Sequence, residues 1–199
     1  MEKRIVVLIS GNGSNLQAII DACNSNEIPG NVVHVVSSKA SAYGIERAKI
    51  ASIPTSVISL KEYKENGKTR EDFNSDLCSL VKSFNPDLIV LAGWMLILSE
   101  SFVNKFVGKL INIHPALPGE FDGAHAIERA YSESKTNNRT KTGVMVHHVI
   151  AQVDRGDVIL SKEIPILETD TLEMLEERIH ETEHQILPLA IKKLLESKI

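Results

Sequence analysis

The run Ile5-Val6-Val7-Leu8-Ile9, followed by Ser10-Gly11-Asn12-Gly13-Ser14-Asn15, decides the fold class of this chain. Five consecutive apolar residues, mostly β-branched, are typical of a strand that is buried on both faces inside a parallel sheet. The polar stretch with two glycines predicts a tight turn, and apolar residues at helical spacing from Leu16 to Cys23 predict a helix after it. The chain therefore begins with a strand–loop–helix unit.

The same alternation continues along the chain. Apolar runs predict further strands at residues 32–36, 55–58, 88–91, 110–113, 143–150 and 158–166. Helical spacing predicts helices at residues 43–51, 70–84, 99–106 and 124–132, and a long amphipathic helix after the capping signal at 169–173, interrupted or redirected at Pro188. Residues 61–68 are expected to form an exposed loop. This order predicts a Rossmann-like α/β fold, with a mostly parallel twisted sheet covered by helices on both faces. Without a linker or repeat, we expect a single domain over residues 1–199.

The composition is ordinary for a globular protein, with 43% hydrophobic and 24% charged residues among 199. A net charge of −4 disfavours general attraction to nucleic acid or to an anionic membrane. No stretch reaches the ~18 apolar residues of a membrane span, and the apolar run near the N-terminus is too short for a signal peptide, so a cytoplasmic location is expected. Cys23 and Cys78 are interpreted as reduced core residues.

The loop Gly11-Asn12-Gly13-Ser14-Asn15 is a candidate phosphate site. Glycines allow close approach of the backbone, and the start of the following helix offers unpaired N–H donors. The loop lacks the Lys-Ser/Thr ending of a P-loop, and Leu16 replaces the third glycine of a dinucleotide-binding motif. The alternative interpretation is a plain tight turn.

Two further stretches could carry chemistry. Asn112 and His114 share one face at the end of a predicted strand, where an amide and an imidazole could stabilise an oxyanion. Asp154, in a loop between two strands, could accept a proton, although a turn aspartate is common. Asp157 is the competing carboxylate, with Arg155 as its possible ion-pair partner.

The histidines do not predict a metal site. His147 and His148 are adjacent in a predicted strand and should point to opposite faces. His180 and His184 lie four residues apart on a predicted helix, which faintly resembles a zinc helix, but we expect no catalytic metal.

Four ordered stretches make the chain resemble the phosphoribosylglycinamide formyltransferase family, within the wider folate-dependent formyltransferases. They are VVLISGNGSNLQAIIDAC at 6–23, DLIVLAGWMLILS at 87–99, INIHPALPG at 111–119 and GVMVHHVIAQVDRGDVIL at 143–160. The resemblance covers nearly the whole chain. It implies transfer of the formyl group of 10-formyltetrahydrofolate to the amine of glycinamide ribonucleotide, in purine biosynthesis and without a metal. It implies small-molecule partners only, with no nucleic acid or membrane, and we expect a monomer or weak homodimer.

The resemblance also assigns residues. It implies that Asn112, His114 and Asp154 are catalytic. The phosphate and ribose of the substrate would contact Gly11, Asn12, Gly13, Ser14, Asn15, His180 and Glu183. The folate would contact Arg70, Met95, Leu96, Ile97, Leu98, Val149, Ile150 and Val153, with residues 149–154 closing over the pteridine.

Two single positions and one short stretch depart from the family pattern. Leu96 replaces a frequent arginine, and residues 116–119 replace a Ser-Leu-Leu-Pro stretch of the broader family. His180 replaces a frequent glutamine near the phosphate and could be a partly cationic partner, since histidine titrates near neutrality.

The expected reaction is amine attack on the formyl carbon. Asn112 and a protonated His114 would stabilise the tetrahedral oxyanion, and Asp154 would accept the amine proton and keep His114 protonated.

Three other functions share parts of this pattern. A formyltetrahydrofolate hydrolase shares the trio of residues but carries an N-terminal regulatory domain, for which no room is expected here. An enzyme that formylates methionyl-tRNA carries a C-terminal nucleic-acid-binding domain, and the net charge disfavours tRNA. A non-catalytic phosphate or nucleotide binder would explain the glycine loop but not the trio.

Overall fold

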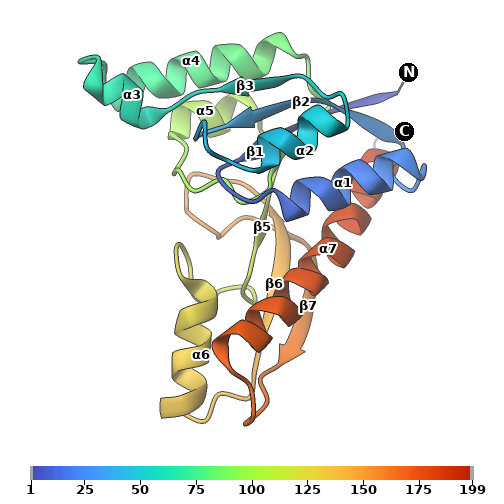
Figure 1. Cartoon of the computed structure of the whole chain (residues 1–199), viewed down its shortest axis with the longest axis vertical. Helices are drawn as coiled ribbons and strands as arrows, with labels where there is room; N and C mark the ends of the chain where they lie inside the picture. The colour runs from blue at the N-terminus through green and yellow to red at the C-terminus, as the bar shows by residue number, and fades with distance from the viewer. Residues whose placement is uncertain (1, 198–199) are drawn as a thin grey trace.

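The computed structural model describes residues 2–197, and its strands form one seven-stranded sheet (Figure 1). The strands lie in the order β3-β2-β1-β4-β5-β6-β7. Neighbours from β3 to β5 are parallel, whereas β6 is antiparallel to both β5 and β7. The strands are β1 (Lys3–Ile9), β2 (Gly30–Ser37), β3 (Thr55–Val57), β4 (Leu88–Leu91), β5 (Leu110–His114), β6 (Lys141–His148) and β7 (Val158–Pro165). The predicted mostly parallel α/β sheet is confirmed.

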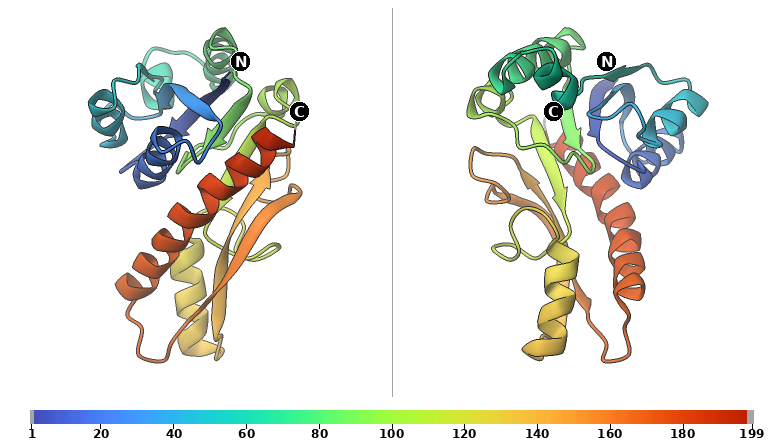
Figure 2. Two further views of the ribbon diagram at one scale, coloured as in Figure 1. Left: turned by 90° about the vertical axis from the view of Figure 1, so that its right-hand side faces the viewer. Right: turned by 60° about the vertical axis from the view of Figure 1, so that its left-hand side comes forward.

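Helices cover both faces of the sheet. They are α1 (Ser14–Asn24), α2 (Gly44–Ile50), α3 (Leu60–Glu65), α4 (Arg70–Ser83), α5 (Glu100–Lys105), α6 (Ala126–Thr136) and α7 (Leu172–Glu196). Alternation along β1 explains the two cores: Ile5, Val7 and Ile9 pack with α1, α2, α6 and α7, whereas Val6 and Leu8 pack with α3, α4 and α5. Helix α7 runs along the length of the molecule, from α6 to α1 (Figures 1 and 2). Among residues 2–197, no helix is both long and apolar enough to cross a bilayer.

Residues 61–68 are not an exposed loop throughout, so that prediction was wrong. Residues 60–65 form α3, because the Ser59 hydroxyl caps the helix by accepting from the Glu62 N–H at 3.3 Å. Tyr63 then packs edge-on against Phe73 of α4, with ring centroids 5.5 Å apart. This contact lies outside the local pattern from which the loop was predicted.

The predicted interruption of the last helix at Pro188 was also wrong. Proline removes the N–H that would bond to the carbonyl of His184, which weakens a helix locally. Helix α7 nevertheless continues to Glu196, because Leu187, Ala190 and Ile191 are fully buried around the proline. Tertiary packing outweighs the local defect.

One serine ties together the loops at the carboxyl ends of three strands. The hydroxyl of Ser10, just after β1, accepts from the Ser38 hydroxyl at 2.6 Å and from the Met95 N–H at 2.9 Å. Ser38 follows β2, and Met95 lies beyond β4. Since His114 ends the parallel strand β5, the glycine loop and the predicted catalytic strand end lie at the same edge of the sheet. Open α/β sheets bind ligands at this edge.

Candidate active site

The glycine loop leads directly into the uncapped start of α1. Gly13 is the N-cap residue, with φ of 77°, and no side chain caps the helix. The first bond of the helix runs from the Gln17 N–H to the Gly13 carbonyl at 2.9 Å, so the N–H groups of residues 14–16 have no partner within the helix. No acidic side chain lies in the first turn. The loop therefore offers unpaired donors and a partial positive charge to an anion.

Helix α2 holds this loop in place. Arg47 donates to both the backbone carbonyl and the side-chain oxygen of Asn12, each at 3.0 Å. Gly13 lies against Gly44 so closely that a Cβ on Gly13 would be 2.6 Å from the Gly44 Cα atom. A Cβ on Gly11, in contrast, would meet no atom within 4 Å. Gly13 is thus required by packing and its positive φ, whereas Gly11 faces open space.

Glu183 of α7 reaches the same loop and is buried there. One of its oxygens, Oε2, accepts from the Asn15 amide at 3.0 Å, and burial raises the pKa of its carboxyl group. The Asn15 oxygen Oδ1 is itself buried without a hydrogen-bond partner. His180 is exposed, and its charge acts on Glu183. The structure therefore brings the first and last helices together at the predicted phosphate and ribose site.

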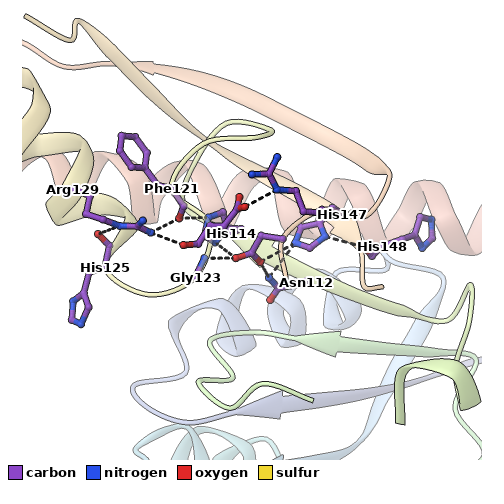
Figure 3. Close-up of polar contacts among 11 residues, drawn as sticks. Asn112, His114, Phe121, Gly123, His125, Arg129, His147 and His148 are labelled. Atoms are coloured by element: carbon purple, nitrogen blue, oxygen red, sulfur yellow. Dashed lines mark hydrogen bonds and ion pairs between the residues drawn. The ribbon is translucent and has the colours of Figure 1, made fainter. Parts of the chain in front are cut away.

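The three residues with predicted catalytic roles meet at the end of β5, where Figure 3 labels Asn112 and His114. Asn112 donates from Nδ2 to Oδ1 of Asp154 at 3.2 Å. His114 Nδ1 lies 3.4 Å from Oδ2 of the same carboxylate, and only 5% and 8% of the two side chains is exposed. The loop between β6 and β7 therefore carries Asp154 back onto the strand that holds the other two residues.

His147 is a fourth member of this cluster, and its role was not predicted from the sequence. It lies on β6 directly opposite Asn112 in the antiparallel pair. Its Nε2 atom is 3.2 Å from the Asn112 Nδ2 atom and 3.5 Å from Asp154 Oδ1, while Nδ1 lies 2.9 Å from the His148 carbonyl. Because a carbonyl only accepts, Nδ1 carries a hydrogen, and Nε2 accepts from Asn112 when neutral or donates to Asp154 when protonated. The antiparallel register, which no local pattern reveals, was the missing signal.

The backbone geometry favours Asp154 over Asp157 as the candidate proton acceptor. Asp154 adopts a left-handed conformation, with φ of 54°, and its Oδ2 accepts from the Gly123 N–H at 2.8 Å. Asp157 is exposed. Arg155 pairs with Asp122, with Nε and Oδ2 2.6 Å apart, so the suggested pair with Asp157 was wrong.

For both Asp154 and His114, burial shifts the pKa in one direction and the charge of the other residue shifts it in the opposite direction. Burial alone would raise the pKa of Asp154, but hydrogen bonds from His147 and Gly123 and the charges of both histidines outweigh it, so this pKa is lowered. Burial lowers the pKa of His114, and the charge of Asp154 and the Phe121 carbonyl offset this only in part. The expectation that Asp154 keeps His114 protonated is therefore corrected: the free protein favours an ionised Asp154 and a neutral His114.

The residues with an expected folate role lie on two neighbouring segments. Met95 and Ile97 are 74% and 62% exposed, whereas Leu96, Leu98 and Val149 pack against the core beside α4 and α5. Ile150 and Val153, on the loop after β6, are also exposed. Leu96 is therefore partly buried and packs against the core.

Arg70 closes one side of this segment. It donates to the Ile97 carbonyl at 2.9 Å, and it lines a pocket of about 250 Å³ with Glu71, Asn74, Ile97, Leu98 and Ser99. Met95 and Ile97 follow the carboxyl end of β4, whose parallel neighbour β5 carries Asn112 and His114.

The histidines of α7 do not form a metal site in the described part of the chain. Residues 180–184 read His-Glu-Thr-Glu-His and do fit the HExxH spacing, so their letters alone do not exclude zinc. Glu183 is, however, buried against Asn15, and no three His, Cys, Asp or Glu side chains within residues 2–197 are grouped to hold a metal ion.

Comparisons with known proteins agree with this geometry. A family model described as formyl transferase matches residues 3–191. The phosphoribosylglycinamide formyltransferase of Dictyostelium discoideum is 51% identical over 203 residues, covering 98% of each chain, and that of Schizosaccharomyces pombe is 49% identical with the same coverage. Among solved structures, glycinamide ribonucleotide transformylase 1 from Geobacillus kaustophilus has a TM-score of 0.90 at 36% identity, covering 98% of this chain and all of that one. The chain belongs to the formyl transferase family.

Proposed function

We propose that the chain transfers the formyl group of 10-formyltetrahydrofolate to the amine of glycinamide ribonucleotide, a step of purine biosynthesis. The observation that carries this proposal is the cluster of Asn112, His114 and Asp154, joined by contacts of 3.2 and 3.4 Å at the carboxyl edge of the sheet. The two relatives named above are phosphoribosylglycinamide formyltransferases, and the similarity covers nearly their whole length. They lend no support to a hydrolase.

The chemistry follows from the cluster. The amine nitrogen forms a bond to the formyl carbon, and the formyl oxygen becomes an oxyanion. Asn112 and His114 stabilise it, and a well-placed donor is worth about 3–4 kcal/mol in such a step. The negative charge of the oxyanion favours protonation of His114 and so opposes the effect of burial on the pKa of His114. Asp154, ionised because its pKa is lowered, accepts the proton that the amine nitrogen must lose. The intermediate then breaks its bond to the folate nitrogen, which takes up a proton.

The glycine loop would hold the substrate phosphate. The N–H groups of residues 14–16 at the start of α1 would donate to it, next to the loop of residues 11–15, and the exposed His180 would add an imidazole. Asn15 and Glu183 would bind the ribose, since Asn15 Oδ1 is a buried acceptor without a donor and two ribose hydroxyls would supply donors.

The exposed apolar residues around Met95, Ile97, Ile150 and Val153 would contact the folate, with Arg70 at the rim. We also propose that one domain carries the whole activity. It would act in the cytoplasm as a monomer or weak homodimer, with small molecules as its only partners.

The test is formyl transfer measured by the absorbance of the deformylated folate. Glycinamide ribonucleotide should support the full rate, whereas the dephosphorylated riboside should not, because phosphate binding is used to orient the amine. Without an amine, formyl loss should be at most a small percentage of the transfer rate, because an oriented amine has a large advantage over water. Rapid formyl loss that ignores the amine would contradict the proposal and indicate a hydrolase.

A further inference from the structure

Besides the side chains of Asn112 and His147, the backbone of one loop, residues 119–125, contacts Asp154 and His114. The Gly123 N–H donates to Asp154 Oδ2 at 2.8 Å, and the Phe121 carbonyl lies 3.2 Å from His114 Nε2 (Figure 3). Both contacts involve main-chain atoms, so they depend on the conformation of the loop rather than on its side chains.

That conformation is unfavourable by itself. Gly119, Phe121, Gly123 and His125, every second residue of the loop, have positive φ angles between 49° and 80°. The two glycines adopt this region readily, but Phe121 and His125 carry a Cβ and are strained there. Some other interaction must hold the loop in this shape.

Arg129, in the first turn of α6, provides that interaction. Its Nη2 atom donates to the carbonyls of Phe121 and Asp122, the latter at 2.8 Å, and its Nε atom donates to the carbonyl of His125 at 3.3 Å. Two of these carbonyls belong to the strained residues. Its guanidinium also lies over the Phe121 ring, with Cζ 5.5 Å from the centroid. A planar group with several fixed N–H donors suits this task, and lysine lacks that geometry.

We propose that Arg129 is a positioning residue for formyl transfer, which holds the loop carbonyls so that Gly123 and Phe121 keep Asp154 and His114 in place. This inference rests on the proposed function for its kinetic test. The geometric part stands without it, because the contacts are present in the free protein.

Arg139 provides a matched control. Its guanidinium lies over the same Phe121 ring, with Cζ 4.7 Å from the centroid, but it bonds to Glu120, Glu133 and the Lys141 carbonyl rather than to the carbonyls of residues 121, 122 and 125. Arg139→Ala removes a ring contact and ion pairs while leaving the three carbonyl bonds of Arg129 intact.

The kinetic test compares Arg129→Ala, Arg129→Lys and Arg139→Ala. Misplacing a catalytic group by about 1 Å can cost about 10²-fold, so we expect kcat to fall at least about tenfold in both Arg129 variants and to change less than about threefold in Arg139→Ala. Added guanidinium ion should restore part of the rate of Arg129→Ala, whereas sodium chloride at equal ionic strength should not. If Arg129→Ala does not purify, Arg129→Lys carries the same test, and a Lys variant with normal kcat would overturn the proposal.

A second readout needs no turnover. Nuclear magnetic resonance titration of the His114 ring in the free protein reports its surroundings, which include Asp154, His147 on β6 and Asp122 in the loop. Loss of the Phe121 carbonyl contact should lower the pKa of His114 in Arg129→Ala, since that contact favours the protonated ring. An unchanged titration would overturn the proposal, whereas a wild-type protein that titrates as expected but transfers no formyl group would refute only the proposed function.

Discussion

At the residue scale, Gly11 and Gly13 stand two positions apart in one loop but have different structural constraints. Gly13 combines a positive φ with a close approach to Gly44, whereas Gly11 has neither. Since Gly13 belongs to the predicted phosphate loop, the sequence by itself would suggest that a Cβ there pushes a phosphate away. The structure shows instead that it would push against the α2 backbone.

We therefore predict different losses for the two substitutions. Gly13→Val should lower the free energy of unfolding by about 1–3 kcal/mol and weaken both substrates, because the strain lies in the fold. Gly11→Val should raise KM for the phosphorylated amine about tenfold, leaving the melting temperature and KM for the folate nearly unchanged. Steady-state kinetics with thermal unfolding separate the two, and equal effects on both ligands in Gly11→Val would count against a phosphate site.

Asp154 should carry the proton transfer. We expect Asp154→Asn to lower kcat by about 10² or more with little change in either KM, since an amide accepts no proton at neutral pH. Because the pKa of Asp154 is lowered, the wild-type enzyme should keep its carboxylate ionised down to mildly acidic pH. Asp157→Asn, at the exposed carboxylate just before β7, is the control and should keep normal turnover. Near-normal kcat in Asp154→Asn would show that the proton leaves by another route.

At the element scale, the entry into α7 depends on a buried ion pair. Asp170 has no exposed side-chain area and accepts two bonds from Arg178, at 2.7 and 2.8 Å, and one from the Leu167 N–H at 2.8 Å. Hydrogen bonds from Arg178 outweigh burial and lower the pKa of Asp170 to about 2 from an ordinary 3.8. The pair fixes the turn before the helix that carries Glu183 to the glycine loop.

The sign of the pH effect follows from this lowered pKa. The contribution of Asp170 to stability is complete above about pH 4 and is lost as the pH falls towards 2, because the unfolded chain takes up the proton first. A pKa that is lower by one in the folded state corresponds to about 1.4 kcal/mol, so the shift from 3.8 to about 2 gives a contribution of at most about 2.5 kcal/mol. Urea unfolding of Asp170→Asn against wild type should show a difference at pH 7 that shrinks below pH 4. A constant difference would contradict the argument.

At the scale of the whole molecule, the site has two parts on one sheet edge. The loop after β1 and helix α7 form the candidate phosphate and ribose site, whereas β5, β6 and the loop after β6 carry the candidate catalytic cluster. The parts should accept their ligands separately.

Inorganic phosphate should therefore stabilise the protein through the first part alone. At a concentration of 100 Kd, binding adds about 2.7 kcal/mol and should raise the melting temperature by roughly 5–10 °C. Phosphate should compete with the phosphorylated amine but not with the folate, and the tenfold weaker binding expected for Gly11→Val should reduce the thermal shift at the same phosphate concentration to about half. Sodium chloride at equal ionic strength is the control, and an equal shift with chloride would refute a specific phosphate site.

Several strands and helix caps of this protein can be predicted from short stretches of the chain. The apolar runs at residues 5–9 and 88–91 predict strands buried on both faces, and both are central in the sheet. Ser99 is the N-cap of α5, as predicted, and Thr171, within the predicted capping signal, is the N-cap of α7. These features can be predicted locally, because the apolar residues of such a run and the residues of a helix cap lie within a few positions of one another in the chain.

Contacts between distant segments decided the rest. The antiparallel pairing of β5 and β6 places His147 against Asn112, the packing of α7 carries its helix through Pro188, and Tyr63 stabilises a helix where a loop was expected. Asp154 is held by the Gly123 N–H, 31 residues away in the chain, whereas Asp157 is exposed. A linear pattern contains the donors and acceptors, but register and loop conformation determine which of them meet, and those depend on the packing of the whole molecule.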